Sequence, residues 1–287
     1  MRRAQVMRCL SVLLAALLLT GCSPTNSGTA AASADNNTSG RDAFSVTLLS
    51  TGKSDCAIIY MDGLVIVNDA ADEDDYEAIA SKLRSDGVTK IDYLILSHYD
   101  KDHIGSAPSL IRNFEVGLIL RTDQAEDSEA YDALVAAEKE RIVPVCVLEK
   151  DYWIETANGQ IKVDPPDMDY GDDNNNSAVT CVTYQGHRLL FLGDAKKKRL
   201  EELLPLLEGS VDFIKLPHHG DSNKALEALI QQACPRWAAE TLSSQDDVAS
   251  KLVELLQALN VQLYSTTNGP VRITWNGEAL DTVQTAA

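Results

Sequence analysis

The chain has 287 residues, of which 45% are hydrophobic and 24% charged, as is usual for a globular domain. This apolar content, without any sustained repeat, excludes a disordered or fibrous protein, and six cysteines are too few for a small disulfide scaffold. Acidic residues number 43 against 25 Lys and Arg, so the formal net charge is −18. So acidic a chain is a poor general binder of duplex nucleic acid, which calls for a basic surface.

The N-terminus has the pattern of an export signal. Three arginines within the first eight residues precede a short, mostly apolar run, 10–19, which is about half as long as a membrane-spanning helix. The run ends in Leu-Thr-Gly-Cys22, which resembles the lipobox of bacterial lipoproteins. The resemblance implies that residues 1–21 are a signal peptide and that Cys22 is lipidated, which would anchor the exported protein to the bacterial cell membrane. The alternative is a plain secretory signal cut nearby, with Cys22 incidental.

Residues 22–42 form a flexible tether in this interpretation. From Ser23 to Asp42 the chain has no aromatic residue and no Val, Ile or Leu, so it cannot bury enough apolar surface to fold. Cleavage of the signal would remove basic residues and no acidic ones, so the exported part would be more acidic still. No second linker follows, and we expect residues 43–287 to form one domain.

Short β-branched runs alternate with amphipathic segments along residues 43–287. Strands are predicted at Ser45–Leu49, Ala57–Met61, Leu64–Val67, Ile91–Leu96, Val116–Leu120, Val143–Leu148, Ala178–Tyr184, Leu189–Leu192, Val211–Lys215, Gln262–Tyr264 and Val271–Trp275. Helices are predicted at Asp75–Ser85, Ser128–Lys139, Lys196–Leu207, Lys224–Ala233 and Gln245–Leu259. Hairpin turns are predicted at Asp62-Gly63, Gln185-Gly186 and Asn268-Gly269. The mixture predicts an α/β domain whose sheets are covered by helices, with some antiparallel pairing.

The strongest chemical signal follows the predicted strand Ile91–Leu96. The next residues read Ser-His-Tyr-Asp-Lys-Asp-His-Ile-Gly, and they offer four potential metal ligands within six residues: His98, Asp100, Asp102 and His103. A polar turn is the simpler alternative, but the chain has only five histidines and two of them are here. We therefore predict a metal site at the end of this strand.

Two later strands also end in side chains that bind metals. The segment Leu190-Phe191-Leu192-Gly193-Asp194 places a carboxylate after an apolar strand and a glycine, where it can bridge two metals. The segment Pro217-His218-His219-Gly220 follows another apolar strand. Each segment alone is a modest signal, because Gly-Asp often closes a strand as a simple turn. The three segments together are specific.

Their order resembles the metallo-β-lactamase superfamily, and within it the hydrolase domain of ComEC-type competence proteins. The likeness spans residues 44–280 and includes Asn68-Asp69-Ala70 after a strand, Asn174-Asn175-Asn176-Ser177, and Tyr264–Gly269, which is similar to the family's last hairpin. The resemblance implies an αββα sandwich in which loops at the ends of strands hold metals at one edge.

The resemblance also implies six metal ligands in two positions. They are His98 and Asp100 for a first metal, Asp102, His103 and His219 for a second, and Asp194 as a bridge between them. His219 is preferred to His218 because it precedes glycine, as in the family's Pro-x-His-Gly pattern. His218 would then contact the charged group of the substrate or protonate the leaving group.

Two departures from the family pattern make this site asymmetric. Asp100 replaces the second His of the usual His-x-His-x-Asp-His motif, and the usual additional His is absent, because His187 lies at the far end of the strand that leads to Asp194. The first position therefore has one His and carboxylates, helped by Asn176 or Ser177, and oxygen-rich positions favour Mn²⁺ or Mg²⁺ over Zn²⁺. We expect one or two divalent metal ions, Zn²⁺ or Mn²⁺, one firmly bound and the other exchangeable.

The predicted function is a surface-tethered hydrolase that uses a metal-activated water oriented by Asp102. The resemblance suggests a phosphodiester or another phosphorylated substrate, small or derived from the cell envelope, because the acidic domain would repel long nucleic acid. A β-lactam fits less well, since both departures match the competence-type branch. The alternative is a non-catalytic binding or structural lipoprotein with a weakened metal site. The basic run Lys196–Arg199 can attract phosphate, but a solvated helix turn paired with Glu201 and Glu202 is the simpler explanation.

Overall fold

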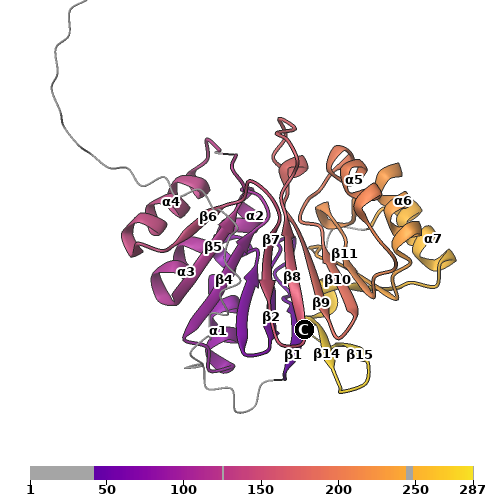
Figure 1. Ribbon diagram of the computed structural model, residues 1–287, viewed down its shortest axis with the longest axis horizontal. Helices are drawn as coiled ribbons and strands as arrows, with labels where there is room; N and C mark the ends of the chain where they lie inside the picture. The colour runs from indigo at the N-terminus through magenta and orange to yellow at the C-terminus, as the bar shows by residue number, and fades with distance from the viewer. Residues whose placement is uncertain (1–41, 125, 244–247, 287) are drawn as a thin grey trace, which may run out of the picture. The chain divides into compact units, whose positions relative to one another are not determined.

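The computed structural model describes residues 42–124, 126–243 and 248–286. The predicted signal peptide at 1–21, Cys22 and all but the last residue of the predicted tether lie outside the described residues. Within the part that is described, no helix is long and apolar enough to cross a membrane. Two β-sheets pack against each other, and helices cover the outer face of each sheet (Figure 1).

The first sheet has eight strands in the order β15-β14-β1-β2-β3-β4-β5-β6. They are β1 Phe44–Leu48, β2 Ala57–Met61, β3 Leu64–Asn68, β4 Lys90–Leu96, β5 Glu115–Arg121, β6 Val145–Val147, β14 Val271–Trp275 and β15 Leu280–Gln284. Strands β15 to β3 pair antiparallel and β3 to β6 pair parallel. The predicted hairpin between β2 and β3 forms at Asp62 and Gly63, which both have the positive φ that a two-residue type I′ turn requires.

The second sheet has seven strands in the order β13-β12-β11-β10-β9-β8-β7. They are β7 Tyr152–Glu155, β8 Gly159–Asp164, β9 Val179–Tyr184, β10 His187–Phe191, β11 Phe213–Lys215, β12 Trp237–Glu240 and β13 Gln262–Ser265. Strands β10 to β13 are parallel, so the loops that follow β10, β11 and β12 emerge at the same edge of the sheet. That edge carries two of the three predicted ligand segments.

Helices enclose both sheets (Figure 1). The first sheet is covered by α1 Tyr76–Ser85, α3 Ala107–Asn113 and α4 Glu129–Arg141, with the short α2 Lys101–Ile104 beside them, and the second by α5 Lys197–Leu203, α6 Lys224–Ala233 and α7 Ser250–Ala258. One apolar cluster fills the space between the sheets. A second lies between the first sheet and its helices, and a third between the second sheet and its helices. Strands of the first sheet are therefore apolar on both faces, as in β2, where Ile59 faces the other sheet and Ile58 the helices. The predicted αββα sandwich is confirmed.

The sequence pattern missed four strands and misplaced one turn. The missed strands are β7, β8, β12 and β15. Strand β12 reads Trp-Ala-Ala-Glu, whose two alanines have little intrinsic strand preference, and its pairing with β11 and β13 makes it a strand. The hairpin predicted at Asn268-Gly269 is wrong, because β13 belongs to the second sheet and β14 to the first. The segment Thr266–Asn268 is a short 3₁₀ turn that carries the chain from one sheet to the other.

Candidate metal centre

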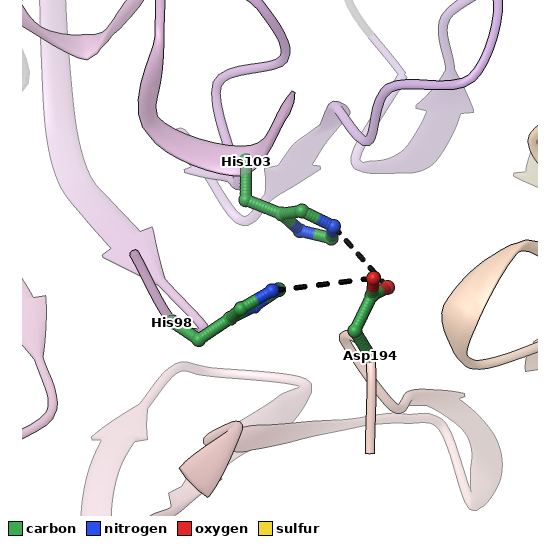
Figure 2. Close-up of side chains that lie close together, drawn as sticks. All are labelled: His98, His103 and Asp194. Atoms are coloured by element: carbon green, nitrogen blue, oxygen red, sulfur yellow. Dashed lines mark ion pairs between the residues drawn. The ribbon is translucent and has the colours of Figure 1, made fainter. Parts of the chain in front are cut away.

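Three loops bring the predicted ligands together at one edge of the sandwich. The loop after β4 and helix α2 carry His98, Asp100, Asp102 and His103, the loop after β10 carries Asp194, and the loop after β11 carries His218 and His219. Gly193 lets the second loop approach the first, because its φ is 53° and a Cβ there would lie 2.9 Å from the Ser97 side chain. Figure 2 shows His98 and His103 from the first of these segments pointing toward Asp194 from the second.

The buried middle of the cluster consists of His98, His103 and Asp194. The two histidines are 0% exposed and Asp194 is 2% exposed. His103 Nε2 lies 3.2 Å from Asp194 Oδ1, and His98 Nε2 lies 4.0 Å from Asp194 Oδ2. Asp194 thus lies between the two histidines, where the predicted bridging ligand must be.

Asp102 and His219 complete one side of the cluster. His219 Nε2 lies 3.2 Å from Asp102 Oδ2 and 3.5 Å from Asp194 Oδ2. One ligand atom each from Asp102, His103 and His219 can be chosen so that all three lie within 4.8 Å of one another. The structure therefore brings together the three residues predicted for the second metal position.

Asp100 lies on the other side of the cluster and is more open. Its Oδ2 is 3.4 Å from His98 Nε2, and its side chain is 41% exposed. The Nδ2 group of Asn174 donates a hydrogen bond of 2.8 Å to the same Asp100 oxygen. Asp173 also offers a carboxylate oxygen to this group.

The sequence prediction that Asn176 or Ser177 assists this position is wrong. The Asn176 side chain hydrogen-bonds to the backbone N–H of Tyr170 and to Asp169, and the Ser177 hydroxyl accepts from the backbone N–H of Asp194. The cause is the 3₁₀ turn Asn174–Asn176, which directs only the first asparagine toward the ligands. The run of asparagines signalled the segment without showing which member reaches the site.

A second layer of polar side chains lies beneath the histidines. Asp69 Oδ2 is 3.0 Å from His103 Nδ1, and the Ser97 hydroxyl donates to the same carboxylate at 2.9 Å. Asp69 stood out in the sequence through the family resemblance. Asp55, Lys215 and Thr241 did not stand out, because they come from separate segments without a recognisable pattern.

Carboxylates dominate the charge at this edge. Burial alone would lower the pKa of His103, but the charges of Asp194, Asp55 and Asp69 raise it well above its ordinary value. Burial would likewise raise the pKa of Asp194, yet His103 and His98 hold it well below the usual range. The carboxylates therefore stabilise positive charge at the point where the histidines converge.

These donors fit a divalent metal ion. His103 Nε2 is buried and lies 3.2 Å from Asp194 Oδ1, where the ligands converge, while its Nδ1 contacts the Asp69 carboxylate. Histidines that bind metals commonly have this arrangement, with one nitrogen on a carboxylate and the other turned to the ion. Imidazole nitrogens combined with carboxylate oxygens suit Zn²⁺ or Mn²⁺. The cluster can therefore hold a metal, and the identity of the ion stays a prediction.

His218 lies at the rim of the cluster. Its side chain is 33% exposed and its Nδ1 is 3.2 Å from Asp221 Oδ2, whereas His219 is 4% exposed and turned inward. The backbone N–H of His218 donates to Asp194 Oδ1 at 3.2 Å. The φ angles of His218 and His219 are 46° and 54°, a left-handed conformation that is uncommon for residues other than glycine. Strain of this kind is often found at functional sites.

The basic run Lys196–Arg199 does not form a free cationic patch. Arg199 is fully buried and pairs with Asp164 at 2.6 Å and with Glu202. Lys197 lies 3.7 Å from Glu201 at helical i,i+4 spacing. The pairing with Glu201 and Glu202 expected in the simpler explanation is therefore confirmed, but Arg199 is buried rather than solvated.

The Metallo-beta-lactamase superfamily matches this chain over residues 50–235, which is more than half of its length. The chain belongs to this superfamily. Members of the superfamily typically bind divalent metals, and the matched range contains all six predicted ligands, from His98 to His219.

Curated relatives of this superfamily member include Competence protein ComA of Neisseria gonorrhoeae, which is 25% identical over 162 residues that cover 56% of this chain and 21% of that protein. ComE operon protein 3 of Bacillus subtilis is 25% identical over 196 residues, which cover 66% of this chain and 25% of that protein. Recombination protein 2 of Haemophilus influenzae is 26% identical over 153 residues, which cover 53% of this chain and 18% of that protein. The chain thus spans a quarter or less of the length of these relatives.

Solved structures agree on the fold. The metallo-beta-lactamase fold protein YhfI from Bacillus subtilis matches with a TM-score of 0.53 at 12% identity, over 79% of this chain and 98% of that one. A diphosphatase of the PhnP family matches with a TM-score of 0.51 at 13% identity, over 81% of this chain and 98% of that one. At these identities the likeness shows the fold alone.

Proposed function

We propose that the protein is a metal-dependent hydrolase of a small phosphodiester or another phosphorylated substrate. The observation that carries the proposal is the buried convergence of His98, His103 and Asp194, with Asp102 and His219 beside them. Buried imidazoles and carboxylates gathered at one point are the donors that a divalent metal ion requires. The resemblance of the motifs to the hydrolase domain of ComEC-type competence proteins favours a phosphodiester.

A bound divalent cation would acidify a water molecule and neutralise charge that develops on the substrate. Asp102 orients the attacking water in this proposal. Burial alone would raise the pKa of Asp102, but the hydrogen bond with His219 and the charge of His103 lower it to about 2, so the carboxylate is ionised at neutral pH. His218 supplies a proton to the leaving oxygen as the bond from phosphorus to that oxygen breaks. Its position at the open rim supports this role.

A groove beside the cluster supports a substrate other than long nucleic acid. It has a volume of about 500 Å³ and is lined by Asp100, by α2 and α3 and by the start of α4. Its charged lining residues are Asp72, Glu73, Asp100, Lys101, Arg112, Glu126 and Glu129. Both cations are paired, Lys101 with Asp72 at 2.9 Å and Arg112 with Glu140 at 2.9 Å. The remaining negative charge disfavours an extended polyanion.

The proposed location is the outer side of the bacterial cell membrane, with a lipid on Cys22 as the anchor. The leader sequence supports this placement, and it leaves the acidic domain facing small or envelope-derived substrates. Labelling of the protein in growing cells with a clickable fatty acid tests it, and the Cys22→Ala variant should lose the label. A labelled Cys22→Ala protein would argue against this anchor.

Turnover of bis-p-nitrophenyl phosphate by the purified protein tests the proposed reaction. After treatment with a chelator, Mn²⁺ or Zn²⁺ should restore activity, and Asp102→Asn should lower kcat by about 100-fold or more. His187→Ala is a matched control, because His187 opens β10 at the end opposite Asp194 and pairs with Asp212 at 3.1 Å. A protein that binds metal without any turnover sensitive to Asp102 would favour the alternative, a binding or structural module.

A further inference from the structure

A buried ion pair lies directly behind His219. Lys215, the last residue of β11, is 3% exposed, and its ammonium group contacts the carboxylate of Asp55, which is 4% exposed. Lysine and aspartate are seldom buried unless they are paired, and burial of a pair does not by itself stabilise the fold. The backbone N–H of Asp55 also donates to the carbonyl of Asp102 at 3.0 Å, so the pair is fixed to the loop that carries the ligands.

Thr241 connects this ion pair to His219. Thr241 follows β12, is fully buried, and places its hydroxyl 3.1 Å from His219 Nδ1. The same hydroxyl donates its proton to Asp55 Oδ1. A carboxylate beside an ammonium group is ionised and can only accept, and a hydroxyl has only one proton to give. The Thr241 oxygen is therefore left to accept, and the proton between it and His219 must be on Nδ1.

We propose that Lys215, Asp55 and Thr241 are positioning residues that reserve His219 Nε2 for the metal ion. The inference rests on the metal of the proposed function. Without the Thr241 acceptor, the ring could instead keep its proton on Nε2, because Asp102 and Asp194 lie 3.2 and 3.5 Å from that nitrogen and compete for it. The hydrogen-bond chain opposes these two carboxylates by giving the proton a better place on the opposite side of the ring.

The backbone of His219 makes this support necessary. Its φ of 54° does not favour any residue with a Cβ, so the conformation persists only if its surroundings hold it. The contact with Thr241 fixes the inner face of the ring while the backbone of the preceding residue is held by Asp194. The turn is thus held by Asp194 of the metal cluster and by Thr241 behind it.

His103 receives the same support by a shorter route. Its Nδ1 contacts the Asp69 carboxylate directly, whereas His219 reaches Asp55 through the Thr241 hydroxyl. A cavity of about 10 Å³, room for one water molecule, is lined by Asp55, Asp69, Lys215 and Thr241. His103 and His219 therefore both contact residues that line this cavity, and Lys215 is the single cation among those lining residues.

The test compares Thr241→Val, which keeps the shape and removes the hydroxyl, with Thr241→Ser, which keeps the hydroxyl. Zn²⁺ and Mn²⁺ affinities are measured by competition with a chromophoric chelator, and the Nδ1–H proton of His219 is observed by NMR in the Zn²⁺-loaded protein. Thr241→Val should weaken metal binding by about 10- to 100-fold and shift or lose the hydrogen-bonded proton signal, because metal binding then leaves a buried N–H without an acceptor. Thr241→Ser should keep the metal affinity and the hydrogen-bonded proton signal of the wild type. Thr122→Val is the control, since that hydroxyl is buried and has no hydrogen-bond partner among the described residues.

A double variant examines the ion pair itself. Lys215→Met combined with Asp55→Leu removes both charges together, which spares the fold an unpaired buried charge. It should weaken metal binding by less than Thr241→Val does, because the hydroxyl remains but no longer has a fixed direction. If Thr241→Val and the double variant both bind metal as the wild type does, the positioning role is wrong and the proposed hydrolase stands. A wild-type protein that binds metal without turnover would overturn the hydrolase alone, and one that binds neither ion would overturn both.

Discussion

The two halves of the metal edge are built differently. On one side His103 and His219 are buried, Asp102 is 26% exposed, and a layer of carboxylates lies behind the two histidines. On the side of His98 the partner is Asp100, whose side chain is 41% exposed and rests on the amide of Asn174. The buried half rests on residues next to strands of both sheets, whereas the open half rests on a single 3₁₀ turn. The two sides of the cluster therefore differ in how many separate segments support their ligands.

Removal of His103 should cause the largest loss of metal affinity, because it affects both halves. His103 lies within reach of ligands of both halves, so His103→Ala should lower the metal affinity of both halves by more than about 100-fold. His98→Ala should lose only the ion of the open half. Metal content per protein, measured by mass spectrometry under native conditions, separates the two outcomes. Equal losses in both variants would show that the halves are not independent.

The support of the open half can be removed without touching a ligand. Arg199 donates to the Ser177 carbonyl at 3.0 Å and pairs with Asp164, and in this way it fixes the turn that carries Asn174. Arg199→Met removes a buried partner from Asp164, which keeps Lys162 at 2.9 Å, and from Glu202, which keeps the Tyr170 hydroxyl, and it should destabilise the protein by about 3 kcal/mol. Urea denaturation measures the loss.

The control for this variant is Arg112→Met, at a surface pair that should contribute less than about 1 kcal/mol. If Arg199→Met folds at low temperature, its metal binding should be weakened in the open half only. Equal stability of the two arginine variants would contradict the role given to Arg199.

A change of one ligand should reduce the difference in metal affinity between the open half and the buried half. Asp100→His restores a second imidazole to the open half, where nitrogen donors suit Zn²⁺ better than oxygen donors do. We expect the weaker Zn²⁺ affinity to rise by about 10-fold and the preference for Mn²⁺ to fall. Calorimetric titration of the chelator-treated protein with each ion reads both changes. Asp221→His, at the rim, controls for adding a histidine nearby, and an unchanged affinity in Asp100→His would place the ion elsewhere.

The sequence predicted the metal ligands better than it predicted the residues that support them. His98, Asp102, His103, Asp194 and His219 follow strands within short motifs, so their convergence followed from the order of the strands. The support comes from single residues far apart in the chain. Asp55 and Thr241 are 186 positions apart, and no local pattern marks either of them.

The same limit explains the errors in the fold. Periodicity found the strands that alternate or are richly branched, but the alanines of β12 gain their strand state from neighbours that are distant in sequence. The turn at Asn268-Gly269 has the residues of a hairpin, yet its two strands belong to different sheets. Local chemistry identified a turn there, and only the packing of the sheets decides which strands it joins.

The smallest expected effect is on stability in acid, and it compares one carboxylate from each half. Hydrogen bonds from His98 and Asn174 lower the pKa of Asp100 against the effect of burial, and the pKa of Asp102 is lowered to about 2. A carboxylate whose pKa is lower in the folded than in the unfolded protein stabilises the fold above its unfolded value of about 4, and this contribution is lost as the pH falls toward the folded value. In the chelator-treated protein, Asp102→Asn should therefore flatten the loss of urea stability between about pH 4 and 2. Asp100→Asn should flatten it less, because its carboxylate is exposed and screened. An equal or larger change in Asp100→Asn would mean that the open half is held as firmly as the buried one.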